Sequence, residues 1–271
     1  MSAPQTKHLQ AGGTIAATLR ARGAIARLAD TAGDLELRGL DATLAGVPIA
    51  LDTRAVVSFE PDALSATPLL VRVGRETAVR LQGALSATGA QTGIDVQVES
   101  AIADLLSLAA PAIPELPINA GPSRVKLDLH VGGTLAAPQP SGTLAVEAAS
   151  LKYADIPSFS DVILDARIEP ARIALHAATA RWQGASLSAD GAIPIRMIVP
   201  PPRPGATGVA SWGSNWLTSL PDETRTATLS ARVTGVTTEA LASFVDPAQL
   251  EQVALTANAT LTADADRKSV V

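Results

Sequence analysis

The stretch from Arg124 to Val131, Arg-Val-Lys-Leu-Asp-Leu-His-Val, decides the fold. Aliphatic residues occupy every second position in it, and charged or polar residues occupy the positions between them. A period of two is typical of a β-strand that has one apolar face and one solvated face. The same alternation returns after Gly142, and again from Asp161, Ile173 and Ser186. We therefore expect a run of half-buried strands.

The first hundred residues repeat this alternation. Glycine and proline lie in the short links between the alternating segments, which is typical of antiparallel strands joined as a meander. The strands are expected at residues 14–21, 34–40, 49–59 (as one long strand), 69–73, 78–87 and 93–99.

Two segments break the alternation and predict short helices. Apolar residues follow helical spacing from Ser100 to Ala110, with Ser100 as the N-cap and Pro111 beyond the end. A second helix is expected at residues 238–245, before Pro247. A helix, a proline and an alternating strand thus occur twice in the same order, and we interpret this as a degenerate internal repeat.

These patterns divide the chain into four parts. Residues 1–99 are expected to form a β meander, and residues 100–196 a helix followed by a β repeat. Residues 197–220 are rich in proline and glycine and are expected to be an irregular insert. Its Trp212 and Trp216 either plug the end of a sheet or contact a membrane interface or a partner. Residues 221–271 are expected to begin a further, truncated β repeat, so we expect a piece of a longer protein.

Composition excludes several classes of function. The net charge is −5 and no basic cluster exists, which argues against a nucleic-acid partner. Cysteine is absent, so disulfides and thiolate metal sites are excluded. No apolar run is long enough for a signal peptide or a membrane-spanning helix. Only 3% of the residues are aromatic, so the apolar layer is built from slender aliphatic side chains.

No pattern of reactive residues stands out. His8, His130 and His176 lack the paired spacing of metal ligands, and the carboxylates fall on the solvated phase of the strands. Phosphate-binding loops and nucleophile motifs are also missing. We therefore expect no catalytic residues, no cofactor, no metal and no enzyme activity.

The apolar phase of the strands is the one candidate for a binding surface. In a closed sandwich of two sheets it would be the core and would imply no ligand. In an open, curved sheet it would be a groove that acyl chains could fill. The candidate groove residues are Val125, Leu127, Leu129, Val131, Leu144, Val146, Val162, Leu164, Ile168, Ile173, Leu175, Leu187 and Ile193.

The order of turns and strands resembles a repeat of TamB and the wider AsmA-like proteins. The segments that carry the resemblance are residues 133–147, 149–153, 159–168, 172–180 and 184–191. Residues 237–261 are similar to the helix and strand that separate the repeats of these proteins. The clear resemblance covers about residues 100 to 263, whereas the first hundred residues are similar only in their general pattern of alternating strands and short turns.

The resemblance implies a mainly β structure, a repetitive antiparallel meander rolled into an open, taco-like groove with a few short helices. It implies a periplasmic protein that is anchored in the inner membrane of a Gram-negative envelope. It also implies phospholipid transport between inner and outer membrane, with phospholipid acyl chains as ligands and an Omp85-type outer-membrane partner. The anchor and the partner-binding end have no counterpart in this sequence, so partner binding would use parts absent here.

Three functions are open at this point. The first is a groove segment for phospholipid transport. The second is a scaffold for assembly and secretion of outer-membrane proteins such as autotransporters, which would work by strand addition. The third is a closed β surface or passenger domain with no ligand.

Overall fold

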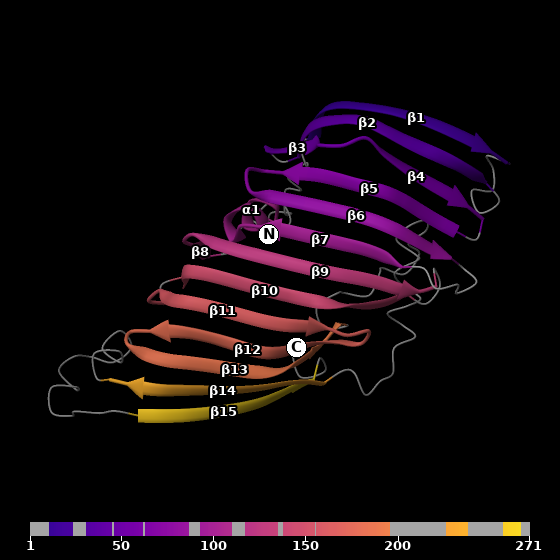
Figure 1. Ribbon diagram of the computed structural model, residues 1–271. Coiled ribbons are helices and arrows are strands. Elements are labelled where there is room, and N and C mark those ends of the chain that lie inside the picture. Colours follow the sequence, from indigo (N-terminus) through magenta and orange to yellow (C-terminus); the bar gives the residue numbers. More distant parts are fainter. Residues whose placement is uncertain are drawn as a thin grey trace, which may run out of the picture.

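The computed structural model describes residues 11–23, 31–44, 46–61, 63–86, 93–109, 117–134, 138–154, 156–195, 226–237 and 257–266. The strands in these ranges form one 15-stranded sheet (Figure 1). Every strand pair in it is antiparallel, and neighbours in the chain are mostly neighbours in the sheet. The predicted mainly β meander is therefore confirmed.

The first half of the sheet comes from residues before the single described helix. Its strands are β1 (Ala11–Arg22), β2 (Ala32–Leu44), β3 (Val47–Leu51), β4 (Ala55–Glu60), β5 (Ala63–Val73), β6 (Thr77–Ser86) and β7 (Ile94–Ser100).

The second half follows the helix α1 (Ile102–Ala109). Its strands are β8 (Ile118–Ala120), β9 (Ser123–Gly133), β10 (Pro138–Tyr153), β11 (Phe159–Ile168), β12 (Arg172–Trp182), β13 (Ala185–Pro194), β14 (Thr226–Val236) and β15 (Ala257–Asp266). Three of the four predicted parts of the chain thus contribute strands to the same sheet, and their division into domains stays a prediction.

The single long strand expected at residues 49–59 is wrong. The structure has two strands there, β3 and β4, with residues 52–54 between them. Both strands lie between β2 and β5 and pair with them at different places along their length. At the break, Asp52 forms an ion pair with Arg72 of β5, and Arg54 forms one with Glu36 of β2. Charged side chains at the break thus reach both neighbouring strands.

The strand expected to resume only after Gly142 starts earlier in the structure, because β10 already begins at Pro138. Pro138 and Pro140 pair with β9, whereas β11 pairs with β10 only from Gly142 onward. Proline has no N–H to donate and is tolerated in a strand where one side has no neighbour. The prolines therefore fit this part of β10 without interrupting it.

The predicted helix after Ser100 is confirmed as α1, and polar contacts hold it to the sheet. The expected N-cap is wrong, because Ser100 is the last residue of β7 and its Oγ bonds to Thr77 Oγ1 and to the backbone oxygen of Ala101. The Asp104 carboxylate accepts hydrogen bonds from the backbone N–H groups of Arg75 (3.0 Å) and Glu76 (2.8 Å). The N–H of Ile102 donates to Ser123 Oγ at 3.0 Å. The second expected helix, Trp212, Trp216 and the irregular insert lie outside the described residues.

The sheet is a single layer over the part of the chain that the structure describes. All described strands belong to it, so no second sheet packs against it there. Among the described residues the buried apolar ones are few, and most of them are small, such as Ala55, Ala166 and Ala185. The described helix is too short to cross a membrane.

Candidate functional site

The register of the central strands collects aliphatic side chains on one face of the sheet. Leu127 of β9 lies opposite Val98 of β7 on one side and opposite Leu144 of β10 on the other. Leu144 in turn lies opposite Ala166 of β11. Residues directly opposite each other in an antiparallel pair point to the same face. A row of aliphatic side chains therefore crosses these four strands.

The aliphatic face continues to both sides of the central strands. Toward the C-terminus, Ile173 lies opposite Ile193 and Leu187 lies opposite Val233. Toward the N-terminus, Leu69 of β5 lies opposite Leu81 of β6. The pairings bring all the candidate groove residues together on this face.

Partial exposure is the property that distinguishes this face from a closed core. Of the candidate groove residues, Val125 is buried, at 7% exposed, and Ile193 is 38% exposed. The others are half-buried. No large side chain among the described residues is fully buried. A core residue is normally surrounded on all sides, so this face retains room for further apolar contacts.

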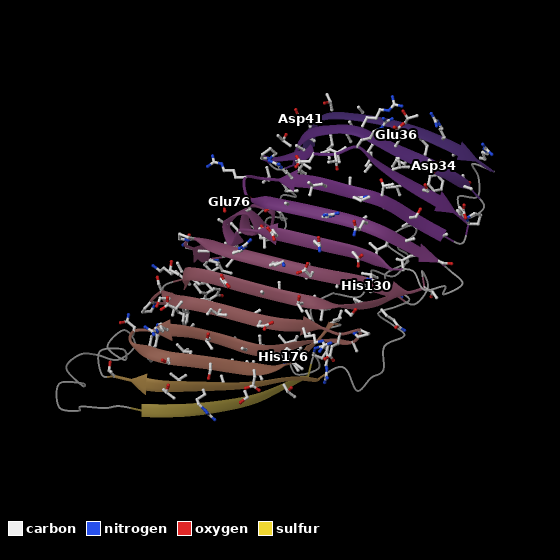
Figure 2. All side chains as sticks on the ribbon, in the orientation of Figure 1. Asp34, Glu36, Asp41, Glu76, His130 and His176 are labelled. Carbon is white, nitrogen blue, oxygen red and sulfur yellow. The ribbon has the colours of Figure 1, made fainter. Side chains whose placement is uncertain are left out.

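The opposite face is polar and contains a hollow of about 570 Å³. Side chains of β6, β7, β9, β10, β11 and β12 line it, and His130 and His176 are among them (Figure 2). Its lining residues are Gln82, Asp95, Gln97, Asp128, Leu129, His130, Ser141, Gly142, Thr143, Asp165, Arg167 and His176.

The polar groups of this hollow pair locally and form no reactive arrangement. His130 Nδ1 lies 2.7 Å from Asp95 Oδ1, and both side chains are about half exposed. Ser141 Oγ donates at 3.5 Å to the backbone oxygen of His130, and the His130 ring contacts Asp95 instead. No cluster of His, Asp or Glu among the described residues could hold a metal ion. His130 and His176 are exposed residues of the sheet, and His8 lies outside the described residues.

Sequence reasoning missed two surface features. The polar hollow combines side chains from six strands, and alternation within one strand does not reveal such a combination. The edge strand β1 carries the two most exposed large apolar side chains of the described residues, Ile15 at 68% and Leu19 at 64%. Their alternation was visible in the sequence, but the position of β1 at the edge was not.

Comparisons with known proteins identify no relative, because no family model, no curated protein and no solved structure matches the chain. The fold and its surfaces define a structural class of protein and no particular family. The described part of the chain is an open, single-layer antiparallel β-sheet with one aliphatic face and one polar face.

Proposed function

We propose that the aliphatic face binds phospholipid acyl chains, and that the chain is a segment of an envelope protein similar to TamB and the AsmA-like proteins. In this role it carries lipid between the inner and outer membrane of a Gram-negative cell. The proposal rests on one observation: aliphatic side chains run across consecutive strands and stay half-buried, with no second sheet over them among the described residues.

The two faces of the sheet suit lipid binding. Acyl chains can lie against the aliphatic face while the polar face stays in water. Burial of an acyl chain contributes about 0.8 kcal/mol per methylene group, so a long chain is held without any polar contact. Slender Leu, Val and Ala side chains leave a smooth surface along which such a chain can shift. The charged residues on the other face, among them Lys126, Asp128 and Asp165, remain in water. Binding of this kind needs no reactive residue.

The test is native mass spectrometry of the protein purified from a Gram-negative periplasm, with extraction and identification of bound phospholipid. We expect lipid to co-purify with the unmodified chain. Leu127→Asp and Leu164→Asp should each lower lipid occupancy by about tenfold or more, because removal of one buried leucine contact costs about 1.5–3 kcal/mol and the carboxylate resists burial.

A matched control uses the same substitution on the opposite face. Ser188 is exposed on the polar face and lies opposite Arg232 of β14. Ser188→Asp should leave lipid occupancy unchanged. A thermal unfolding curve for each variant separates lost binding from lost structure. Lipid-free unmodified protein, or equal occupancy in Leu127→Asp and Ser188→Asp, would contradict the proposal.

A further inference from the structure

The edge strand β1 has a neighbour on one side only. The strand order of the sheet begins with β1, which pairs with β2 and with no other described strand. No described strand pairs with the backbone N–H and C=O groups on its outer side, and a strand edge of this kind is a template for pairing. Residues 12–17 and 19–22 are all exposed, so no described part of the chain covers these residues.

The exposed apolar side chains of β1 lie on the aliphatic face. Ile15 lies opposite Leu40 and Leu19 lies opposite Leu35, both on β2. Yet Ile15 is 68% exposed and Leu19 is 64% exposed. The next most exposed large apolar residue in the described ranges, Ile163, is 51% exposed. A strand added next to β1, with aliphatic residues on the same face of the sheet, would cover the side chains of Ile15 and Leu19.

We infer that the β1 edge pairs with the β1 edge of a second copy of this chain, antiparallel and centred on Ala17. In this register Ile15 lies opposite Leu19 of the second copy. By the two-fold symmetry, Leu19 lies opposite Ile15 of the second copy. Ala17 lies opposite Ala17, and Arg20 lies opposite Thr14. One surface then serves both partners, as in a two-fold symmetric dimer. The aliphatic faces of the two copies become continuous.

The charges of this edge favour the antiparallel register. A parallel pairing in the same register would place Arg20 against Arg20 and Arg22 against Arg22, which is unfavourable. The antiparallel register places Arg20 opposite Thr14, whose neighbour on β2 is Asp41. Within the described ranges, neither Arg20 nor Asp41 forms an ion pair, and Asp41 lies at this edge (Figure 2). The long Arg20 side chain can thus reach across Thr14 to a free carboxylate.

The absence of cysteine from the chain allows a direct test of the register. Directly opposed residues have Cα atoms about 4.5–5.5 Å apart, which is within the range of a disulfide. Under mild oxidation Ala17→Cys should therefore form a covalent dimer. Ala16→Cys is the matched control: its partner position is Thr18, so two such thiols lie about 8 Å apart by Cα. We expect it to cross-link more than about tenfold more slowly.

A second measurement uses light scattering after size-exclusion chromatography of the cysteine-free chain. We expect a dimer that Ile15→Lys converts to a monomer, while Leu229→Lys, on β14 of the same face, stays dimeric. Equal cross-linking of the two cysteine variants would overturn the inference. So would a monomer at every concentration, or a monomer that captures an added amphipathic strand peptide on β1. These outcomes do not bear on lipid binding, so the two proposals fail independently.

Discussion

At the scale of single residues, the sheet depends on glycines that let neighbouring strands approach closely. A Cβ atom on Gly142 would lie 2.1 Å from the backbone oxygen of Asp128 and 2.9 Å from the Cα of Leu129. A Cβ atom on Gly83 would likewise lie 2.1 Å from the backbone oxygen of Gly93, just before β7, and one on Gly191 would lie 2.2 Å from that of Thr228 on β14. Glycine within a strand marks such close approaches.

Gly142→Ala should therefore destabilise the protein. The new methyl group meets backbone atoms, which cannot rotate away as a side chain does, so β9 and β10 must separate. We expect a loss of about 1–3 kcal/mol in the free energy of unfolding, measured by urea denaturation. Gly132→Ala on β9 is the control, because its nearest contact would be an ordinary 3.5 Å to the His130 side chain. Equal effects of the two substitutions would show that close strand approach is not the cause.

The role of Gly142 was only partly predictable from the sequence. Its place on the aliphatic phase of an alternating segment signals a missing side chain. The nearby Pro138 and Pro140 interrupt the alternation in the sequence, and proline is usually excluded from a strand that pairs on both sides. In the structure the two prolines remain within β10 because this part of β10 pairs with β9 only. The sequence of one strand does not show which of its sides is paired.

At the scale of elements, the Asp104 carboxylate attaches α1 to the turn before β6, in addition to the hydrogen bond between Ile102 and Ser123. Asp104 Oδ2 accepts hydrogen bonds from two backbone N–H groups in the turn before β6, and from Thr77 Oγ1 at 3.3 Å. Thr77 Oγ1 also lies 2.6 Å from Ser100 Oγ, and both residues are buried. The helix thus closes a small polar cluster at the ends of β6 and β7.

Asp104→Ala should remove this attachment. The turn loses its acceptor, and a hydrogen bond to a charged group contributes about 1.5–3 kcal/mol. We expect a comparable loss of stability in urea denaturation, with increased cleavage near α1 in limited proteolysis. Glu147→Ala, an exposed carboxylate on β10 without a hydrogen bond or ion pair to any described residue, should change stability by less than about 0.5 kcal/mol. An unchanged proteolysis pattern in Asp104→Ala would contradict the role given to this carboxylate.

The sequence predicted elements better than it predicted their connections. The phase of β9, with Leu127 and Leu129 on one face, follows from alternation alone and is confirmed by the pairing with β7. The short strand β8 was missed, since a three-residue strand has too few positions to show a period. The break between β3 and β4 was missed because residues 49–59 alternate through it. Ion pairs with neighbouring strands, which form only in the folded sheet, accompany that break.

At the scale of the whole molecule, the sheet has two unlike faces and little interior. Among the described residues no large side chain is fully buried, although the aliphatic face crosses consecutive strands. The hydrogen-bonded ladder, rather than a closed core, holds the strands together. The alternation in the sequence could not distinguish this arrangement from a sandwich, because both require the same pattern on each strand.

Calorimetry can measure this lack of an interior directly. The heat capacity of unfolding rises with the apolar surface that unfolding exposes, and compact proteins give about 12–15 cal/mol/K per residue. A single-layer sheet buries less apolar surface on folding, so we expect a value below this range for protein stripped of lipid with detergent. Urea denaturation should give a correspondingly shallow slope for a chain of this length. A heat capacity within the range of compact proteins would mean that the aliphatic face is covered in solution, and it would remove the surface on which lipid binding depends.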